Sequence, residues 1–519
     1  MKNSFTTIPG LLAYQAQVHP NRLALSVQSH WGYRDRLTYS QLDFLGTRMG
    51  CALRALGIKK GDRIAVFLTN DSGREAVITA LGCFAIGAAV VPLNTRSSDE
   101  ELRYAINSVE PTRIVTIASS AQRLYALASI RQILIDKDLS ELTNDNTLDQ
   151  WPEPLAEHPP SGSLPSPDPE DLTCLLFTSG TTAHPKVVMH NHKTMLATGH
   201  AMGSALGLQY DDIYQGAFPF FTSSCLNLAC MSTWVKGATF VMEHGLNTAQ
   251  RLELIETERT SYYHGVPSIL QFMIDEETLH RRNFLHLKRV AYGGAAMPVA
   301  TIERIAEQWP WTSQVQVWGM TESGPAGTYL PSTHTKEKIG SIGLPMPSCE
   351  IAVVDDQLQA VPVGDVGELL FRGPSQAIGY FRDPKATEMT FTDGWLRTGD
   401  LVKQDEDGFL YFLDRKKDVI NRGGLKIASV AVESVLYKMA GVVEAAVISI
   451  PHASLGEDVV ACLVLSPGSA VTTDQLREFC ATRLADYEVP RQWFFLDALP
   501  KSPIGKILKR ELRAQVLKS

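Results

Sequence analysis

The N-terminal part of the chain alternates short apolar runs with longer segments whose apolar positions recur three or four residues apart. Short apolar runs bounded by turn residues are typical of buried strands, and the longer spacing is typical of amphipathic helices. The pattern predicts helices over residues 37–57, 73–84 and 99–108 and strands over residues 63–68, 88–93 and 113–117. Strands that alternate with helices indicate a parallel sheet covered by helices.

The same alternation continues after residues 139–170, a polar segment rich in Pro, Ser, Asp and Glu that we expect to be a surface connection. It predicts helices over residues 193–206, 248–257 and 267–277 and strands over residues 238–242, 261–265 and 287–292. After about residue 348 the pattern changes to short strands with turns such as Asp407-Gly408, as in β-hairpins. The chain closes with predicted strands over residues 445–450 and 459–465 and a helix over residues 473–484.

These changes of pattern predict an α/β protein with two domains. We expect a large N-terminal domain of stacked β/α sheets, residues 1–414, with a β-rich subdomain at about 348–414. A small α/β C-terminal domain would occupy residues 415–519, with the junction near Asp414 to Lys417. The length of 519 residues is too great for one hydrophobic core, which favours this division.

One segment raises the question of a membrane span. Residues 76–93 are almost wholly apolar and approach the minimum length for crossing a bilayer. Gly82, Gly87 and Pro92 interrupt the run. We therefore interpret it as a buried helix, a turn at Gly87 and a buried strand, and we expect no transmembrane segment.

Composition and charge narrow the function classes. With 44% hydrophobic and 20% charged residues, the composition is that of a soluble protein, and the net charge of −8 argues against nucleic-acid binding. Eight scattered cysteines without a CxxC pair indicate neither a disulfide framework nor a zinc site. The N-terminus has no signal-peptide pattern, so we expect a cytoplasmic protein. His190 and His192 lack a further ligand cluster, which favours a structural role over a metal site.

Residues 173–190, TCLLFTSGTTAHPKVVMH, depart from this background. Two short apolar runs, residues 175–177 and 187–189, are typical of strands and flank a polar connection. That connection carries Thr178, Ser179, Gly180, Thr181, Thr182 and Lys186. Hydroxyls and backbone N–H groups can wrap an anion, and glycine allows close approach, so a polyphosphate site is predicted. A Ser/Thr-rich turn has the same composition. The segment is not a Walker A loop, which opens a helix and ends in Gly-Lys-Ser/Thr.

Four other places carry side chains suited to a nucleotide. Small residues at the strand end 292–298 leave room for a flat ring, at the sheet edge where ligands bind to parallel sheets. Residues 316–322 offer an aromatic face, a hydroxyl and a carboxylate that suits Mg²⁺. Asp400 can accept hydrogen bonds from two ribose hydroxyls, and Lys506, next to Gly505, can reach a developing negative charge.

Together and in this order, the five stretches resemble the adenylate-forming superfamily, in particular its acyl-CoA synthetase branch, over roughly residues 10–515. The resemblance implies nucleotide contacts from Thr178, Ser179, Gly180, Thr181, Thr182, Lys186, Gly294, Ala295, Ala296, Gln316, Trp318, Gly319, Met320, Asp400 and Arg415. It implies that Thr321 touches the α-phosphate, Glu322 holds Mg²⁺ and Lys506 serves the adenylation step. It also implies a mobile C-terminal domain, with a hinge at Lys417 and a coenzyme A tunnel at Gly424.

The implied reaction uses ATP and Mg²⁺ to activate a carboxylic acid as acyl-AMP and then transfers the acyl group to coenzyme A. The acyl pocket would be lined by Phe220, Phe221, Thr222, Cys225, Tyr263, His264, Gly293 and Gly324. Because these residues are mostly aromatic or small and none is Lys or Arg, we expect an aryl or medium-chain acid. A separate carrier protein as acceptor and a non-catalytic nucleotide sensor are the alternatives. No carrier domain follows Lys506, which favours free coenzyme A.

The chain departs from the pattern of the superfamily at several places. Ala183 and Val187 replace glycines of the phosphate loop, and Trp318 stands where tyrosine is commoner. In a motif on the pantetheine side, Ser429 and Ala431 replace a proline and a glutamate, whereas Glu433 is kept. Thr222 replaces a histidine. These departures leave Lys506, Glu322 and Asp400 in place, so we expect an active enzyme.

Overall fold

The computed structural model describes residues 5–136, 148–151, 164, 166–178, 185–295, 297–501 and 507–518. The first large sheet of this part runs β16 (Leu344–Pro345), β15 (Thr328–Leu330), β14 (Ser313–Trp318), β13 (Arg289–Gly293), β12 (Tyr262–Gly265), β10 (Ile213–Gly216), β11 (Thr239–Met242), β1 (Leu23–Gln28), β2 (Arg34–Thr38). The second runs β19 (Gly379–Tyr380), β9 (Lys186–Asn191), β8 (Leu172–Thr178), β4 (Ala89–Pro92), β3 (Arg63–Val66), β5 (Arg113–Thr116), β6 (Gln132–Leu134), β7 (Leu148–Gln150). The central strands of both sheets pair in parallel.

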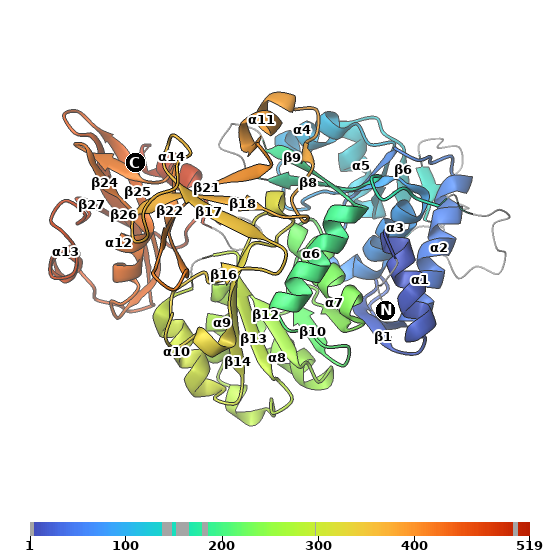
Figure 1. Ribbon diagram of the computed structural model, residues 1–519, viewed down its shortest axis with the longest axis horizontal. Helices are drawn as coiled ribbons and strands as arrows, with labels where there is room; N and C mark the ends of the chain where they lie inside the picture. Colours follow the sequence, from blue (N-terminus) through green and yellow to red (C-terminus); the bar gives the residue numbers. More distant parts are fainter. Residues whose placement is uncertain are drawn as a thin grey trace.

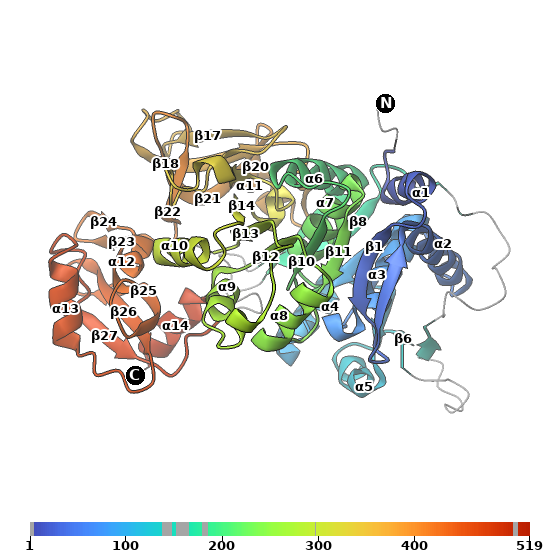
Figure 2. The same cartoon turned by 90° about the horizontal axis from the view of Figure 1, so that it is seen from below.

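Two smaller sheets follow along the chain. The third contains β17 (Glu350–Val354), β18 (Val366–Arg372), β20 (Phe391–Thr392), β21 (Trp395–Gln404) and β22 (Leu410–Arg415), all paired antiparallel. The fourth contains β23 (Ile420–Arg422), β24 (Leu425–Ile427), β25 (Val442–His452), β26 (Gly456–Leu465) and β27 (Gln492–Phe495). Figures 1 and 2 place the fourth sheet at one end of the molecule and the N-terminal helices at the other.

Helices cover the sheets and fill the space between them (Figure 1). In chain order they are α1 (Ile8–Val18), α2 (Tyr39–Ala55), α3 (Gly73–Ile86), α4 (Asp99–Val109), α5 (Ala118–Leu127), α6 (His192–Ala205), α7 (Met231–Lys236), α8 (Thr248–Thr257), α9 (Pro267–Ile274), α10 (Val299–Gln308), α11 (Pro384–Thr390), α12 (Ser429–Leu436), α13 (Thr473–Ala481) and α14 (Lys509–Val516). One hydrophobic core joins both large sheets to α2, α3, α6 and α7. Every residue of α3 is buried, as expected for a helix enclosed on all sides.

The predicted α/β class is confirmed, and so are the predicted helices and strands of the first two sheets, to within a few residues at their ends. Local signals account for several boundaries. A capping box between Thr38 and Gln41 starts α2. Gly87, with φ of +71°, ends α3, because a left-handed residue at this point suits glycine.

The apolar segment 76–93 forms the end of α3, the turn at Gly87 and strand β4, as predicted. No helix in the described ranges is long and apolar enough to cross a membrane. The polar segment 139–170 lies mostly outside the described residues, but it contains β7, a strand that the sequence pattern did not predict.

Candidate active site

Strands β8 and β9 form an antiparallel pair in which Thr178 lies opposite Lys186. These two residues are the ends of the predicted phosphate loop. Ser179, Gly180, Thr181 and Thr182, predicted to contact the nucleotide, lie outside the described residues between them, as does Ala183. The pairing of the two strands nevertheless defines where the predicted loop leaves and rejoins the second sheet.

Side chains from two separate segments of the chain contact Glu322. The Tyr380 hydroxyl donates a hydrogen bond to Glu322 Oε1 at 3.0 Å, and the Thr178 hydroxyl approaches the same oxygen at 3.4 Å. Lys186 Nζ lies 4.4 Å from the centre of the Tyr380 ring, where a cation–π contact is favourable. Burial raises the pKa of Tyr380 and the Glu322 carboxylate raises it further, so the phenol keeps its proton and remains a donor.

Tyr380 is a site residue that the sequence pattern did not single out. It lies on β19, a two-residue strand that pairs with β9 beside Val188. The segment 376–381, QAIGYF, has no spacing or charge pattern that marks its tyrosine as part of a site. Its position depends on the return of the chain to the edge of the second sheet, nearly two hundred residues after β9.

Thr321, next to Glu322, is held from two sides. Its hydroxyl lies 3.1 Å from Ser223 Oγ, and its carbonyl accepts a hydrogen bond from His190 Nε2 at 2.9 Å. Burial lowers the pKa of His190 to about 4, so the ring is neutral and carries its proton on Nε2. His190 therefore has the structural role that its sequence context favoured, at the backbone of a predicted catalytic residue.

A second cluster joins the residues predicted for adenine and ribose. The Trp318 indole N–H donates to Asp400 Oδ2 at 2.9 Å, and Arg415 Nε lies 2.5 Å from Asp400 Oδ1. Asp400 and Arg415 are neighbours across the β21–β22 pair, and Asp400 is completely buried. Trp318 ends β14, so the two clusters are connected through the short segment from Trp318 to Glu322.

The small residues predicted beside adenine lie at the carboxyl ends of β13 and β14. Gly294 has φ of +78° and no atom closer than 3.8 Å to the position of a β-carbon, whereas a β-carbon on Gly319 would lie 2.2 Å from the Pro325 carbonyl oxygen. Gln316 is buried beside Tyr292 in the neighbouring strand, and Ala295 is exposed. Met320 donates its backbone N–H to Ser323 Oγ at 3.0 Å. Ala296 lies outside the described residues.

Three residues of the predicted acyl pocket are buried. Phe220 and Cys225 are buried in the large core, and His264 contacts the rings of Tyr214 and Phe218. His264 Nδ1 lies 2.5 Å from the Tyr214 hydroxyl, and burial lowers the pKa of His264 to about 3, so the ring is neutral. This region combines aromatic surface with uncharged polar groups.

The remaining predicted pocket residues differ in position. Tyr263, predicted for the pocket together with His264, packs with Leu252 and Leu270 in a separate core, since adjacent residues of a strand face opposite sides. Phe221 is half-buried, and the hydroxyl of Thr222 donates to the Pro219 carbonyl at 2.7 Å. The two pocket glycines allow close packing: a β-carbon would meet the Val317 oxygen at 2.5 Å for Gly293 and the Ser375 oxygen at 2.2 Å for Gly324.

Residues 224–230 form a π-helix that the sequence pattern did not predict. It follows directly after Ser223, which contacts Thr321, and it contains Cys225 of the predicted pocket. Such π-helical turns are frequent at functional sites. The segment therefore connects the predicted acyl pocket with a predicted catalytic residue.

The predicted hinge and coenzyme A residues are exposed. Lys417 lies between β22 and β23, where the chain passes from the third sheet to the fourth. Gly424 has φ of +91°, and no atom lies within 4 Å of the position of its β-carbon. Lys506 lies outside the described residues.

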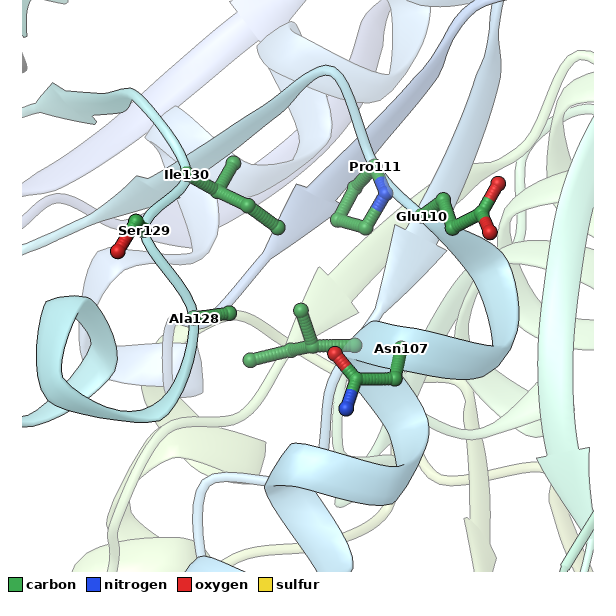
Figure 3. Close-up of a pocket in the computed structure, with 7 residues that line it drawn as sticks. Asn107, Glu110, Pro111, Ala128, Ser129 and Ile130 are labelled. Carbon is green, nitrogen blue, oxygen red and sulfur yellow. The ribbon is translucent and has the colours of Figure 1, made fainter.

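A surface hollow of about 490 Å³ lies apart from these clusters (Figure 3). Its lining residues come from α4, the end of α5 and the segments that follow them: Ile106, Asn107, Glu110, Pro111, Ala128, Ser129 and Ile130. None of these is among the residues predicted for the nucleotide or the acyl group. The hollow is open to solvent, so it does not change the location of the candidate site.

Two family models match most of the chain. The family model of AMP-binding enzymes matches residues 12–381, and the model of the AMP-binding enzyme C-terminal domain matches residues 431–506. The chain belongs to the AMP-binding enzyme family. The superfamily predicted from the five sequence stretches is thereby confirmed.

Similar members of the AMP-binding enzyme family are CoA ligases. Feruloyl-CoA synthase of an Amycolatopsis species is 31% identical, and the match covers 92% of this chain and 93% of that protein. Long-chain-fatty-acid–CoA ligase FadD13 of Mycobacterium tuberculosis is 32% identical over the same shares of the two chains. O-succinylbenzoate coenzyme A synthetase of Bacillus subtilis, solved with ATP and magnesium ion, has a TM-score of 0.84 and 29% identity and covers 97% of this chain and 98% of that one. The predicted enzyme class, an AMP-forming acid–thiol ligase, is confirmed by these relatives.

Proposed function

We propose that the protein is an ATP-dependent carboxylic acid:CoA ligase that activates an aryl or medium-chain acid as acyl-AMP. The observation that carries the proposal is the direct connection of two clusters. Trp318, Asp400 and Arg415 suit a nucleoside, and Thr178, Lys186, Thr321 and Glu322 suit its phosphates. They are joined by residues 318–322, a segment of five residues. Both clusters could therefore contact a single nucleotide.

A carboxylate becomes an acylating agent when one of its oxygens is converted into a leaving group. The carboxylate of the acid attacks the α-phosphorus of ATP, and the bond to pyrophosphate breaks, giving acyl-AMP. Two anions must approach each other, so the main task of the protein is to position them and to neutralise charge. Lys186 and the predicted loop would bind the β- and γ-phosphates, Thr321 the α-phosphate, and Lys506 would stabilise charge on the oxygens of the reacting phosphate.

The donor set around Glu322 fits a magnesium ion bound together with ATP. Mg²⁺ prefers oxygen ligands and is commonly held by one or two carboxylates plus substrate phosphates. Glu322 supplies the carboxylate, with the hydroxyls of Thr178 and Tyr380 beside it. When bound, the ion neutralises phosphate charge. Tyr380 donates to one oxygen of Glu322 and thereby fixes the orientation of the carboxylate.

In the second step the thiol of coenzyme A attacks the acyl carbonyl and AMP leaves. The lysine of the first step must then give way to the pantetheine arm. Rotation of residues 415–519 about Lys417 would exchange Lys506 for the face that carries Gly424, a motion about a few residues at the end of an element. The open surroundings of Gly424 suit the approach of a narrow pantetheine chain.

The acyl substrate is inferred from the aromatic region around His264. Phe218 and Tyr214 contact the His264 ring and supply apolar surface, and His264 is neutral, so a second carboxylate on the substrate would be buried without a cationic partner. Two relatives are named for feruloyl-CoA and for long-chain fatty acids. The feruloyl group and the long fatty acyl chain both have a large apolar part. An aryl or medium-chain monocarboxylate fits this region best.

A panel of acids in two linked assays tests the proposal. Purified protein with ATP and Mg²⁺ is assayed for acid-dependent exchange of pyrophosphate into ATP, and then for thioester formation with free coenzyme A. We expect hydroxycinnamates, benzoates or medium-chain fatty acids to give the highest kcat/KM in both assays. Exchange without thioester product would indicate a carrier protein as the acceptor instead. A dicarboxylate as the best substrate would contradict the proposed acid class.

The contact between Trp318 and Asp400 predicts a specific effect on ribose recognition. Trp318→Phe keeps an aromatic face for adenine but removes the N–H that orients the Asp400 carboxylate. Hydrogen bonds to charged groups contribute about 1.5–3 kcal/mol, so the preference for ATP over 2′-deoxy-ATP should fall about tenfold or more. The ratio of the two kcat/KM values measures this effect, because loss of stacking alone would lower both equally. Trp395→Phe, at a tryptophan packed on Arg372 in the third sheet, is the matched control and should leave the ratio unchanged.

A further inference from the structure

Lys509, the first residue of α14, lies in a buried polar network only three residues after Lys506. Its Nζ lies 2.7 Å from Glu433 Oε1 on α12, and it also donates to the Ser429 hydroxyl. The same oxygen of Glu433 accepts a hydrogen bond from the backbone N–H of Val447 in β25 at 2.8 Å. Burial raises the pKa of Glu433 and the adjacent ammonium of Lys509 opposes this increase. Lys509 thus connects the start of α14 with α12 and β25.

The network extends to the end of the third sheet. The Ser429 hydroxyl donates to Asp414 Oδ2 at 2.6 Å, and the backbone N–H of Ser429 donates to the same oxygen. Ser429 is completely buried, and Asp414 on β22 is 2% exposed. A hydroxyl has one proton and two acceptor sites, so it can donate to Asp414 and accept from Lys509 at the same time. The Lys509 ammonium therefore lies between two carboxylates. It contacts Glu433 directly and is linked to Asp414 through the Ser429 hydroxyl.

Serine at position 429 is one of the departures from the superfamily, which has proline at this place. Proline has neither a backbone N–H nor a hydroxyl. With proline at this position, Asp414 would lose two donors and Lys509 would lose an acceptor. The network through Ser429 therefore requires a residue other than proline at this position.

The segment on the other side of Lys506 is also fixed. Lys501 forms an isolated antiparallel bridge with Ile507, and the Leu508 N–H donates to the Pro500 carbonyl at 2.8 Å. Lys501 also pairs with Glu444 of β25. After Lys509, Leu512 and Val516 of α14 pack in the core formed with β25 and β26. Residues 502–506 lie between these two attachments, outside the described residues.

We propose that Lys509, held by Glu433 and Ser429, is a positioning residue for the adenylation half-reaction. Lys509 attaches the chain just after Lys506 to α12 and, through Ser429, to Asp414. This attachment determines which positions the Lys506 side chain can reach. The inference rests on the proposed function, because it takes Lys506 as the lysine of adenylation. A displacement of about 1 Å at a reacting group can cost up to about 10²-fold in rate. Loss of the anchor therefore acts on the step that uses Lys506.

Full-length Lys509→Met, measured in the two half-reactions separately, tests the proposal. Acid-dependent ATP–pyrophosphate exchange reports adenylation, and thioester formation from synthetic acyl-adenylate and coenzyme A reports the second step. We expect the exchange kcat to fall about 10- to 10²-fold with a similar KM for ATP, while thioester formation keeps its wild-type rate. Lys509→Arg, which keeps the charge, should recover most of the exchange. Arg513→Met, on the same helix and bonded to Ser449, is the matched control and should leave the ratio of the two rates unchanged.

Equal losses in both half-reactions would overturn the proposal, since a role in stability alone has that result. An exchange rate unchanged by Lys509→Met would also overturn it. If Lys509→Met does not fold, Ser429→Ala carries the test: it removes the hydroxyl that links Lys509 to Asp414, keeps the backbone N–H bond to Asp414 and the Lys509–Glu433 ion pair, and should lower exchange alone. If the wild-type protein shows no acid-dependent exchange, the proposed function itself is contradicted. The wild-type measurement therefore distinguishes a failure of the proposed function from a failure of the Lys509 proposal.

Discussion

Lys506→Ala should lower acid-dependent ATP–pyrophosphate exchange about 10²–10³-fold, the usual effect of losing one preorganised donor to a developing charge. The carboxylate and the α-phosphate are both anionic, and Lys506 is the residue expected to supply positive charge where their bond forms. In the proposed mechanism Glu322 would hold an ion at a different part of the triphosphate, so it would not replace the lysine. The effect should appear in kcat, because the lysine acts mainly as charge shifts between the reacting oxygens.

The same variant should form thioester from synthetic acyl-adenylate and coenzyme A at close to the wild-type rate. In that step Lys506 has to leave the site, so its side chain contributes nothing. Lys518→Ala, which removes an exposed lysine of the same domain outside both attachments, is a control for charge and should affect exchange far less. If Lys506→Ala exchanged pyrophosphate as well as wild type, the assignment of the adenylation lysine would be wrong.

Glu322→Gln should have the second largest effect, about 10²-fold on exchange, with a higher Mg²⁺ concentration needed for half-maximal rate. The substitution keeps the size of the side chain and removes its charge. A neutral amide keeps one oxygen that can accept from Tyr380 and Thr178, but its nitrogen is a donor, so only one side-chain oxygen remains for an ion. Titration of Mg²⁺ at fixed ATP measures both changes.

Tyr380→Phe removes the hydrogen bond that orients the Glu322 carboxylate and keeps the charge of Glu322. Partners that orient a metal-binding side chain typically account for about 10–100-fold in metal affinity or activity. We therefore expect a shift of the Mg²⁺ dependence in the same direction as for Glu322→Gln, with a smaller loss at saturating Mg²⁺. A normal Mg²⁺ dependence in Glu322→Gln would show that the ion is held elsewhere.

Most of the architecture could be predicted because the central strands and helices have strong local patterns. The run from Ala76 to Leu93 illustrates this, since Gly87 alone divides it into a helix and a strand. The sequence pattern failed where long-range packing decides the structure. The π-helix at residues 224–230 has no local signature, and β7 is three residues long within a polar segment.

In the candidate site, too, local patterns predicted residues, whereas contacts that depend on long-range packing were not predicted. Residue types and motif order were enough to select Trp318 and Asp400, but not their hydrogen bond, since 82 positions separate them and the third sheet brings them together. Tyr380 was missed for the same reason. Tyr263 and His264 were both predicted for the acyl pocket, although adjacent residues of β12 face opposite sides and Tyr263 packs in a separate core. The network around Lys509 likewise depends on four segments, α14, α12, β25 and β22, that meet only in the folded protein.

The central claim is that this protein makes acyl-AMP from a carboxylic acid and ATP. Exchange of labelled pyrophosphate into ATP, measured with and without an aryl or medium-chain acid and in the absence of coenzyme A, tests it most directly. We predict exchange that requires both the acid and Mg²⁺, and that is lost in Lys506→Ala. Exchange that does not depend on any acid, or ATP hydrolysis to ADP and phosphate in its place, would contradict the account.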